Sequence, residues 1–197
     1  MTGFRQAKRR FIPISEAILD EAMKVAERVG IPYNILIEKI LNETMKVMKY
    51  KPNVLDMLSM ADSLDDIRRL GGIVLPWVFV KKTLDSMSAS DFNELLKELS
   101  KISLWYGELA RVKRTSSPGE FQRAISLWIP SSSIDVLSEE EGVYKFVVAL
   151  LEASPRVIEV AKTIVSGLAK GYNLKIIEIL AGSHIVTIRV SGFVEED

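Results

Sequence analysis

The first fifty residues constrain the fold of this chain more than any other stretch of its 197 residues. A basic, β-branched run, Arg9-Arg10-Phe11-Ile12-Pro13-Ile14, comes first. Apolar residues then recur at helical spacing from Ile18 to Val29 and again from Leu36 to Met48, with Gly30 between the two segments. The stretch therefore predicts a strand, a helix, a glycine turn and a second helix.

Residues with known positional preferences predict where these two helices begin and end. Ser15 is placed to cap the first helix, and Gly30 lies just past its last periodic residue, where a left-handed cap favours glycine. Asn34 is placed to cap the second helix. The Pro52-Asn53 pair predicts that the second helix ends near Lys51.

This N-terminal segment is too small to form a core alone. Two short helices and a six-residue strand bury too little surface, although they are rich in Ile, Leu and Val. Pairing of two chains solves the problem, because one strand from each chain can form a two-stranded antiparallel ribbon above interlocked helices. We therefore expect residues 1–51 to form an obligate homodimer.

Charge is distributed unevenly, although the chain as a whole is neutral with 26 basic and 26 acidic side chains. Residues 1–51 hold ten Lys or Arg against six Asp or Glu, a net charge of +4, so residues 52–197 carry −4. Four of the ten positive charges lie between Arg5 and Arg10. A basic end on an acidic body is typical of a protein that binds a polyanion there, and an ordinary solvated arm is the alternative.

The run from Ile14 to Ile37 resembles the ribbon-helix-helix family of DNA-binding proteins. It continues without a gap from the end of the strand into the second helix. The family's glycine between the helices matches Gly30, and its capping Ser/Thr position matches Asn34. The resemblance covers about a fifth to a quarter of the chain and implies a homodimeric, DNA-binding transcriptional regulator.

The resemblance also implies which residues contact double-stranded DNA. In that family the ribbon reads base edges in the major groove, and the N-terminus of the second helix holds a phosphate. Arg5 and Lys8 would contact further phosphates, and the backbone of residues 33–35 would hold one. The implied DNA-binding residues are Arg5, Lys8, Arg9, Arg10, Phe11, Tyr33 and Asn34.

The outer face of the expected ribbon departs from the family's pattern. Alternation with the isoleucines facing the core puts Arg9, Phe11 and Pro13 on that face, and a one-residue slip puts Arg10 there instead. Phenylalanine can touch a thymine methyl, whereas proline offers no side-chain hydrogen bond and removes a ladder donor. Non-specific DNA binding, or dimerisation with binding of a protein partner, are therefore alternatives to base reading.

Residues 52–72 predict a linker helix between the module and the rest of the chain. A Met- and Leu-rich piece begins at Val54, and the Gly71-Gly72 pair ends the segment. The following run, Ile73–Val80, is very apolar, and its proline suits only the first turn of a helix. Its compactness predicts burial against the dimer partner or against the sheet.

Residues 73–197 predict a helix-rich α+β domain for dimerisation or for sensing a small-molecule effector, and a small-molecule sensor is a further alternative for the whole chain. Ser90 is placed to cap a long amphipathic helix, Thr115–Gly119 predicts a turn, and Ser154-Pro155 opens a helix that ends at Gly171. The strand-like runs are 121–129, 143–151, 174–180 and 184–190. This order predicts a four-stranded, mainly antiparallel sheet with helices on one face.

Composition restricts the chemistry that this chain can perform. It holds no cysteine, which excludes disulfides, zinc-thiolate sites and thiol nucleophiles, and His184 is its only histidine. Without a phosphate loop or a Ser-His motif, we expect no enzyme, metal or cofactor. No apolar run reaches the roughly 18 residues that span a bilayer, so we expect a soluble, cytoplasmic protein that binds no membrane. Few glutamines and abundant Ile, Val, Lys and Glu are typical of a thermophilic source.

Overall fold

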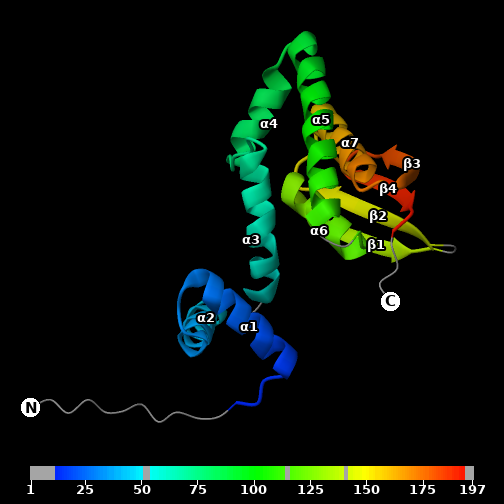
Figure 1. Ribbon diagram of the computed structural model, residues 1–197. Helices are drawn as coiled ribbons and strands as arrows, with labels where there is room; N and C mark the ends of the chain where they lie inside the picture. Colours follow the sequence, from blue (N-terminus) through cyan, green and yellow to red (C-terminus); the bar gives the residue numbers. More distant parts are fainter. Residues whose placement is uncertain (1–11, 51–53, 114–115, 140–141, 194–197) are drawn as a thin grey trace, which may run out of the picture. The chain divides into compact units, whose positions relative to one another are not determined.

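The chain has an α+β fold with seven helices and one four-stranded sheet among the residues described by the computed structural model (Figure 1). The described residues are 12–50, 54–113, 116–139 and 142–193. They fall into two compact units, one within Met1–Leu58 and the other within Ser59–Asp197. Helix α3 (Val54–Arg69) begins in the first unit and ends in the second.

The N-terminal unit contains two helices joined by a tight glycine turn. Helices α1 (Glu16–Val29) and α2 (Tyr33–Met48) confirm the predicted helix pair. Gly30 adopts the left-handed conformation with φ 73°, and the N–H of Ile31 donates to the carbonyl of Ala26 at 3.1 Å. The predicted role of this glycine is confirmed, because a side chain at that φ would strain the backbone.

The cap predictions for the helix pair are partly wrong. Ser15 occupies the cap position of α1, although its side chain accepts no cap hydrogen bond from a described residue. Asn34 is not the cap of α2, because the helix begins at Tyr33 and Asn34 is its second residue. Pro32 holds the cap position with φ −58°, a value that its ring imposes. The helix ends at Met48, before the predicted end near Lys51.

The predicted N-terminal strand is absent from the part of it that is described. Residues 12–15 belong to no helix or strand, residues 9–11 lie outside the described residues, and the described strands all lie in the C-terminal part. The physical reason is that a ribbon strand has no hydrogen-bonding partner within one chain, since its partner comes from a second copy. The fold of the single chain therefore does not support a ribbon-helix-helix arrangement.

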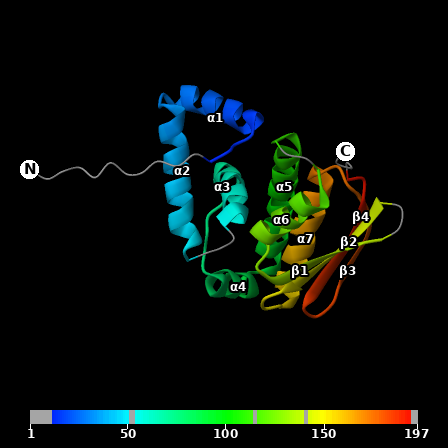
Figure 2. The ribbon, with the colours of Figure 1, turned by 90° about the horizontal axis from the view of Figure 1, so that it is seen from below.

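The C-terminal unit packs helices against one face of an antiparallel sheet. Its helices are α4 (Trp77–Ser86), α5 (Ala89–Lys113), α6 (Pro118–Trp128) and α7 (Pro155–Gly171). Its strands are β1 (Ser131–Ser138), β2 (Val143–Leu150), β3 (Lys175–Ala181) and β4 (Ile185–Ser191). The strand order is β1-β2-β4-β3 with every neighbouring pair antiparallel. Figure 1 and Figure 2 show α5, α6 and α7 on the same face of the sheet, which confirms the predicted layering.

The first predicted strand, Phe121–Ile129, is wrong, because most of this run forms α6. Ser117 caps the helix by accepting the N–H of Glu120 at 3.3 Å, and Pro118 occupies the first turn. The predicted turn is thus the start of a helix, with residues 114 and 115 outside the described part. The first strand is instead the serine-rich Ser131–Ser138, which lies at an edge of the sheet.

The other predicted elements agree with the structure to within one or two residues. Ser154 caps α7 by accepting the N–H of Val157 at 3.3 Å, and the helix ends at Gly171 as predicted. In α5 the first-turn N–H of Asp91 donates to Ser88 at 3.1 Å, so Ser88 and not Ser90 provides the cap. The last two strands begin and end one residue later than predicted.

A buried carboxylate connects α3 to α5 within the C-terminal unit. Asp66 is fully buried, and its Oδ1 lies 2.5 Å from the Nζ of Lys113. The same Nζ lies 3.4 Å from an oxygen of Asp62. The hydrogen bond to Asp66 raises the pKa of Lys113 above its ordinary value of 10.5. Lys113 therefore stays protonated throughout the physiological pH range.

Replacing Lys113 by methionine is expected to lower the urea midpoint, because buried Asp66 loses this cation. Folding raises the pKa of Lys113. The pair's contribution to stability is therefore complete at a pH below the ordinary pKa of lysine, and it is lost as the pH rises through the pKa of Lys113 in the folded chain. The difference in urea midpoint between Lys113→Met and wild type should therefore be larger at about pH 8 than at about pH 11. Lys101→Met is the control, because its pair with Glu98 is exposed and contributes little. Equal differences at the two pH values would contradict this account.

Candidate nucleic-acid interface

The helix pair α1–α2 exposes most of its apolar side chains. Ala26 is the only buried residue of these two helices. Ile18, Val29, Ile40 and Met45 are between 52% and 63% exposed. Full burial of one such side chain contributes about 1.5–3 kcal/mol to stability. The helix pair thus lacks a core of its own, and an apolar partner surface would stabilise it substantially.

A hollow of about 290 Å³ lies at the turn between α1 and α2. Its lining is mostly apolar and comes from both helices and the turn. The lining residues are Met23, Ala26, Glu27, Gly30, Ile31, Pro32 and Tyr33. The hollow can accept an apolar side chain, but one carboxylate among apolar groups is a poor set for catalysis or for an anionic ligand.

Two of the predicted DNA-binding residues, Tyr33 and Asn34, are described, and both lie exposed in the first turn of α2. Their N–H groups donate to no described residue, whereas the N–H of Ile35 donates to the carbonyl of Pro32 at 3.0 Å. Two of the three predicted backbone donors are thus available to an anion. The other predicted residues, Arg5, Lys8, Arg9, Arg10 and Phe11, lie outside the described residues.

The positive charge of the N-terminal region lies in its arm and not on the helix pair. Residues 12–50 hold five basic and six acidic side chains, a net charge of −1. Two of the lysines are paired with glutamates one turn away, Lys24 with Glu21 and Lys46 with Glu43, each at 2.6 Å. Attraction of a polyanion to this unit therefore depends on the four basic residues of the arm.

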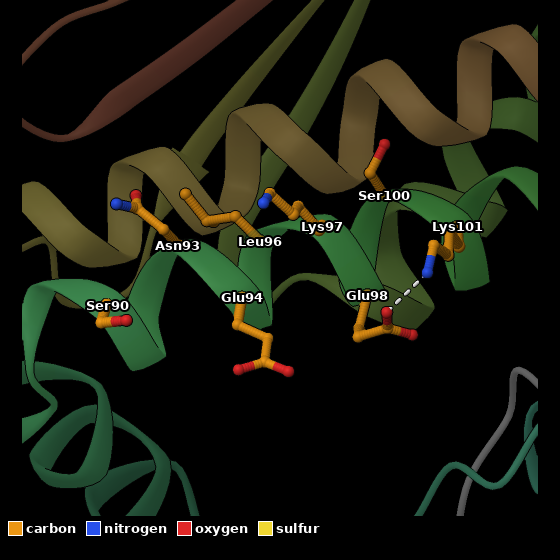
Figure 3. A pocket seen from close by; sticks show the side chains of 8 residues that line it. All are labelled: Ser90, Asn93, Glu94, Leu96, Lys97, Glu98, Ser100 and Lys101. Atoms are coloured by element: carbon orange, nitrogen blue, oxygen red, sulfur yellow. Dashed lines mark hydrogen bonds and ion pairs between the residues drawn. The ribbon is translucent and has the colours of Figure 1, made fainter.

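A second hollow, of about 790 Å³, lies along α5. All of its described lining residues come from this one helix, between Ser90 and Lys101. Figure 3 shows Glu94 and Glu98 extending away from the helix, and Glu98 accepts a hydrogen bond from Lys101 at 2.7 Å. Because no second element contributes a described polar group, the hollow does not form a convergent site.

A charged cluster lies on the face of the sheet opposite the helices. Arg189 alternates with the buried residues of β4, and its Nη2 lies 2.7 Å from Glu139. Its Nη1 lies 3.8 Å from Glu178 on β3. The hydrogen bond to Glu139 raises the pKa of Arg189. Since two carboxylates already neutralise this guanidinium, the cluster is unsuited to binding an anion.

Other kinds of site find no support in the described part of the chain. No group of three or more His, Cys, Asp and Glu side chains there could hold a metal ion. Asp65, next to Asp66 in α3, pairs with Arg69 at 2.7 Å. None of the helices, as far as they are described, is long and apolar enough to cross a membrane.

Sequence patterns alone did not indicate that the apolar run Ile73–Val80 would divide its side chains between two sides. Trp77 and Val80 pack against the core, whereas Val78 and Phe79 are exposed. The run is nevertheless apolar on all sides, and a helix of that kind cannot bury every face against one neighbour.

Comparison with known protein families, with curated proteins and with solved structures finds no match for this chain.

Proposed function

We propose that this chain is a homodimeric, DNA-binding transcriptional regulator. The observation that carries the proposal is the apolar surface of α1 and α2, which bury only Ala26 and leave Ile18, Val29 and Ile40 exposed. A second copy of the same surface is the partner that matches it in size and chemistry. The resemblance of residues 14–37 to the ribbon-helix-helix pattern supports the same arrangement.

The basic arm supplies the contact with double-stranded DNA in this proposal. Two arms bring eight positive charges to one end of the dimer, four from each copy. Arg9 and Phe11 would approach the groove, while Arg5 and Lys8 would contact phosphates. The available N–H groups of Tyr33 and Asn34 would hold a further phosphate at the start of α2. The C-terminal unit then serves dimerisation or effector sensing.

Ile40→Asp is expected to convert the dimer into monomers and to weaken DNA binding with it. A charge placed in the apolar surface would be buried without a partner, which should raise the dimer dissociation constant by about a hundredfold or more. Light scattering over a range of protein concentrations gives the mass, and fluorescence anisotropy with a labelled duplex gives the affinity. Asn42→Asp is the matched control, since it adds the same charge to an exposed polar position of α2. A monomeric wild type would contradict the proposal, as would unchanged assembly of Ile40→Asp.

Dimerisation without DNA binding is the second candidate function. The net charge of −1 on residues 12–50 favours it, because the helix pair itself repels a polyanion. Pro13 favours it as well, since a proline cannot read a base edge. In that case the dimer would form at every salt concentration, and no duplex would bind to it.

A further inference from the structure

The C-terminal part of α3 meets the rest of its unit through a polar face. We refer to residues 61–70 as the α3 docking segment. Its two buried side chains are polar, Ser63 with 2% exposed and Asp66 with none. Residues three apart lie on the same side of a helix, so these two form one face. The apolar side chains of the segment are buried less, since Leu64 is 41% exposed and Ile67 and Leu70 are only partly buried against the core.

A lysine of α5 holds this polar face in place. The Nζ of Lys113 lies 2.5 Å from Asp66 and 3.4 Å from Asp62. The attraction within a buried ion pair roughly offsets the cost of taking both charges out of water. Undocking returns both charges to water, so it costs far less than leaving one of them buried alone. The docking segment therefore suits both the docked and the undocked state, as an apolar face would not.

Helices α5 and α7 of the same unit are held more firmly. Helix α7 buries Val165, Leu168 and Ala169 completely. Gly171 of α7 approaches α5 so closely that a Cβ there would lie 2.7 Å from the Cα of Gly107. A segment with few buried apolar contacts opens at a lower free energy than a tightly packed core. The α3 docking segment therefore opens more readily than α5 and α7.

The chain that follows the docking segment allows α3 to move without unravelling. Gly71 adopts the left-handed conformation with φ 83°, and residues 72–76 belong to no helix or strand. Rotation about the backbone of these residues changes the direction of α3 without breaking hydrogen bonds within α3 or α4. Residues 71–76 therefore have the form of a hinge.

We propose that the α3 docking segment undocks from α5 while α5, α6, α7 and the sheet stay folded, and that this opening regulates the connection between the two compact units. Helix α3 begins in the first unit, so its release lengthens the part of the chain that joins them. An effector or a partner that binds one of the two states more tightly shifts the balance between them. The opening involves no residue of the basic arm or of α1 and α2, so it goes beyond the proposed DNA binding and does not depend on it.

Hydrogen–deuterium exchange of the full chain, followed by mass spectrometry at several low concentrations of urea, tests the opening. Amides of residues 63–70 are expected to exchange at least about tenfold faster than those of α7, because a released helix of this length does not protect them in water. Their exchange should also depend less on urea, since undocking exposes less surface than unfolding of the whole unit. Exchange of α3 at the rate of α7, or with the same urea dependence, would overturn the proposal.

Variants of Lys113 show whether the ion pair governs the opening. Lys113→Met should speed exchange of residues 63–70 at least about tenfold further while α7 stays protected, because Asp66 loses its cation only in the docked state. Lys113→Arg keeps the cation and should stay near wild type. Lys101→Met is the matched control, since it removes an α5 lysine whose pair with Glu98 is exposed.

Two results with these variants would contradict the proposal. The first is unchanged exchange of α3 in Lys113→Met, or the same gain in Lys101→Met. The second is a Lys113→Met chain that does not fold, because α5, α6, α7 and the sheet would then require docked α3.

Discussion

Replacing Gly171 by alanine is expected to destabilise the C-terminal unit by about 3 kcal/mol or more, or to prevent its folding. A Cβ at this position would lie 2.2 Å from the carbonyl oxygen of Leu104 and 2.7 Å from the Cα of Gly107. Both atoms belong to the backbone of α5, so they cannot move aside as a flexible side chain does. Helices α5 and α7 would have to separate, and the core between them and the sheet would open.

Thermal unfolding followed by circular dichroism measures this effect. Gly119→Ala is the matched control, because a Cβ there meets no atom closer than the Oγ of Ser117 at 4.0 Å. Gly119 lies in the first turn of α6, and alanine at a compatible helical position stabilises a protein by about 0.4–1 kcal/mol. A Gly171→Ala variant as stable as wild type would mean that α5 and α7 do not approach each other this closely.

Neutralising the arm is expected to cause the largest loss of DNA affinity. Glutamine in place of Arg5, Lys8, Arg9 and Arg10 removes eight positive charges from a dimer. Removing one contact to a phosphate lowers the slope of log affinity against log salt by about 0.9. The salt dependence of duplex affinity should therefore become much weaker, and at low salt the affinity itself should fall by about a thousandfold.

The matched control removes the same charge from the helix pair. Glutamine in place of Lys24, Lys39, Lys46 and Lys49 changes the net charge of each chain equally. Two of these lysines are already paired with glutamates, so their loss should change the salt slope less than loss of the arm. Equal slopes for the two variants would mean that net charge, and not the arm, governs binding.

Local chemistry made several elements of this fold predictable from sequence. Gly30 after an amphipathic run and Ser154-Pro155 before one act through their immediate backbone, so no distant contact is needed to interpret them. The prediction of a strand at Phe121–Ile129 was wrong for the opposite reason, because its structure depends on distant contacts. A short apolar run suits a buried helix as well as a strand, and only its packing beneath the sheet decides between them.

Strand β1 and the candidate site were less predictable, because both depend on hydrogen-bonding partners elsewhere. Serines do not favour a strand, so Ser131–Ser138 forms one only because β2 supplies its hydrogen bonds. The expected ribbon needs such a partner from a second chain, and for this reason one chain cannot display it. The side of α4 that faces outward was not predictable either, because Ile73–Val80 is apolar throughout and sequence alone does not say which side meets the core.

The most direct test of the central claim is a duplex titration of the full chain at two salt concentrations, with the mass measured on the same sample. A DNA-binding homodimer predicts twice the chain mass of 22.1 kDa. It also predicts that affinity falls about a thousandfold or more between about 50 mM and about 200 mM salt. A monomer, an affinity that does not depend on salt, or no binding to any duplex would contradict the claim.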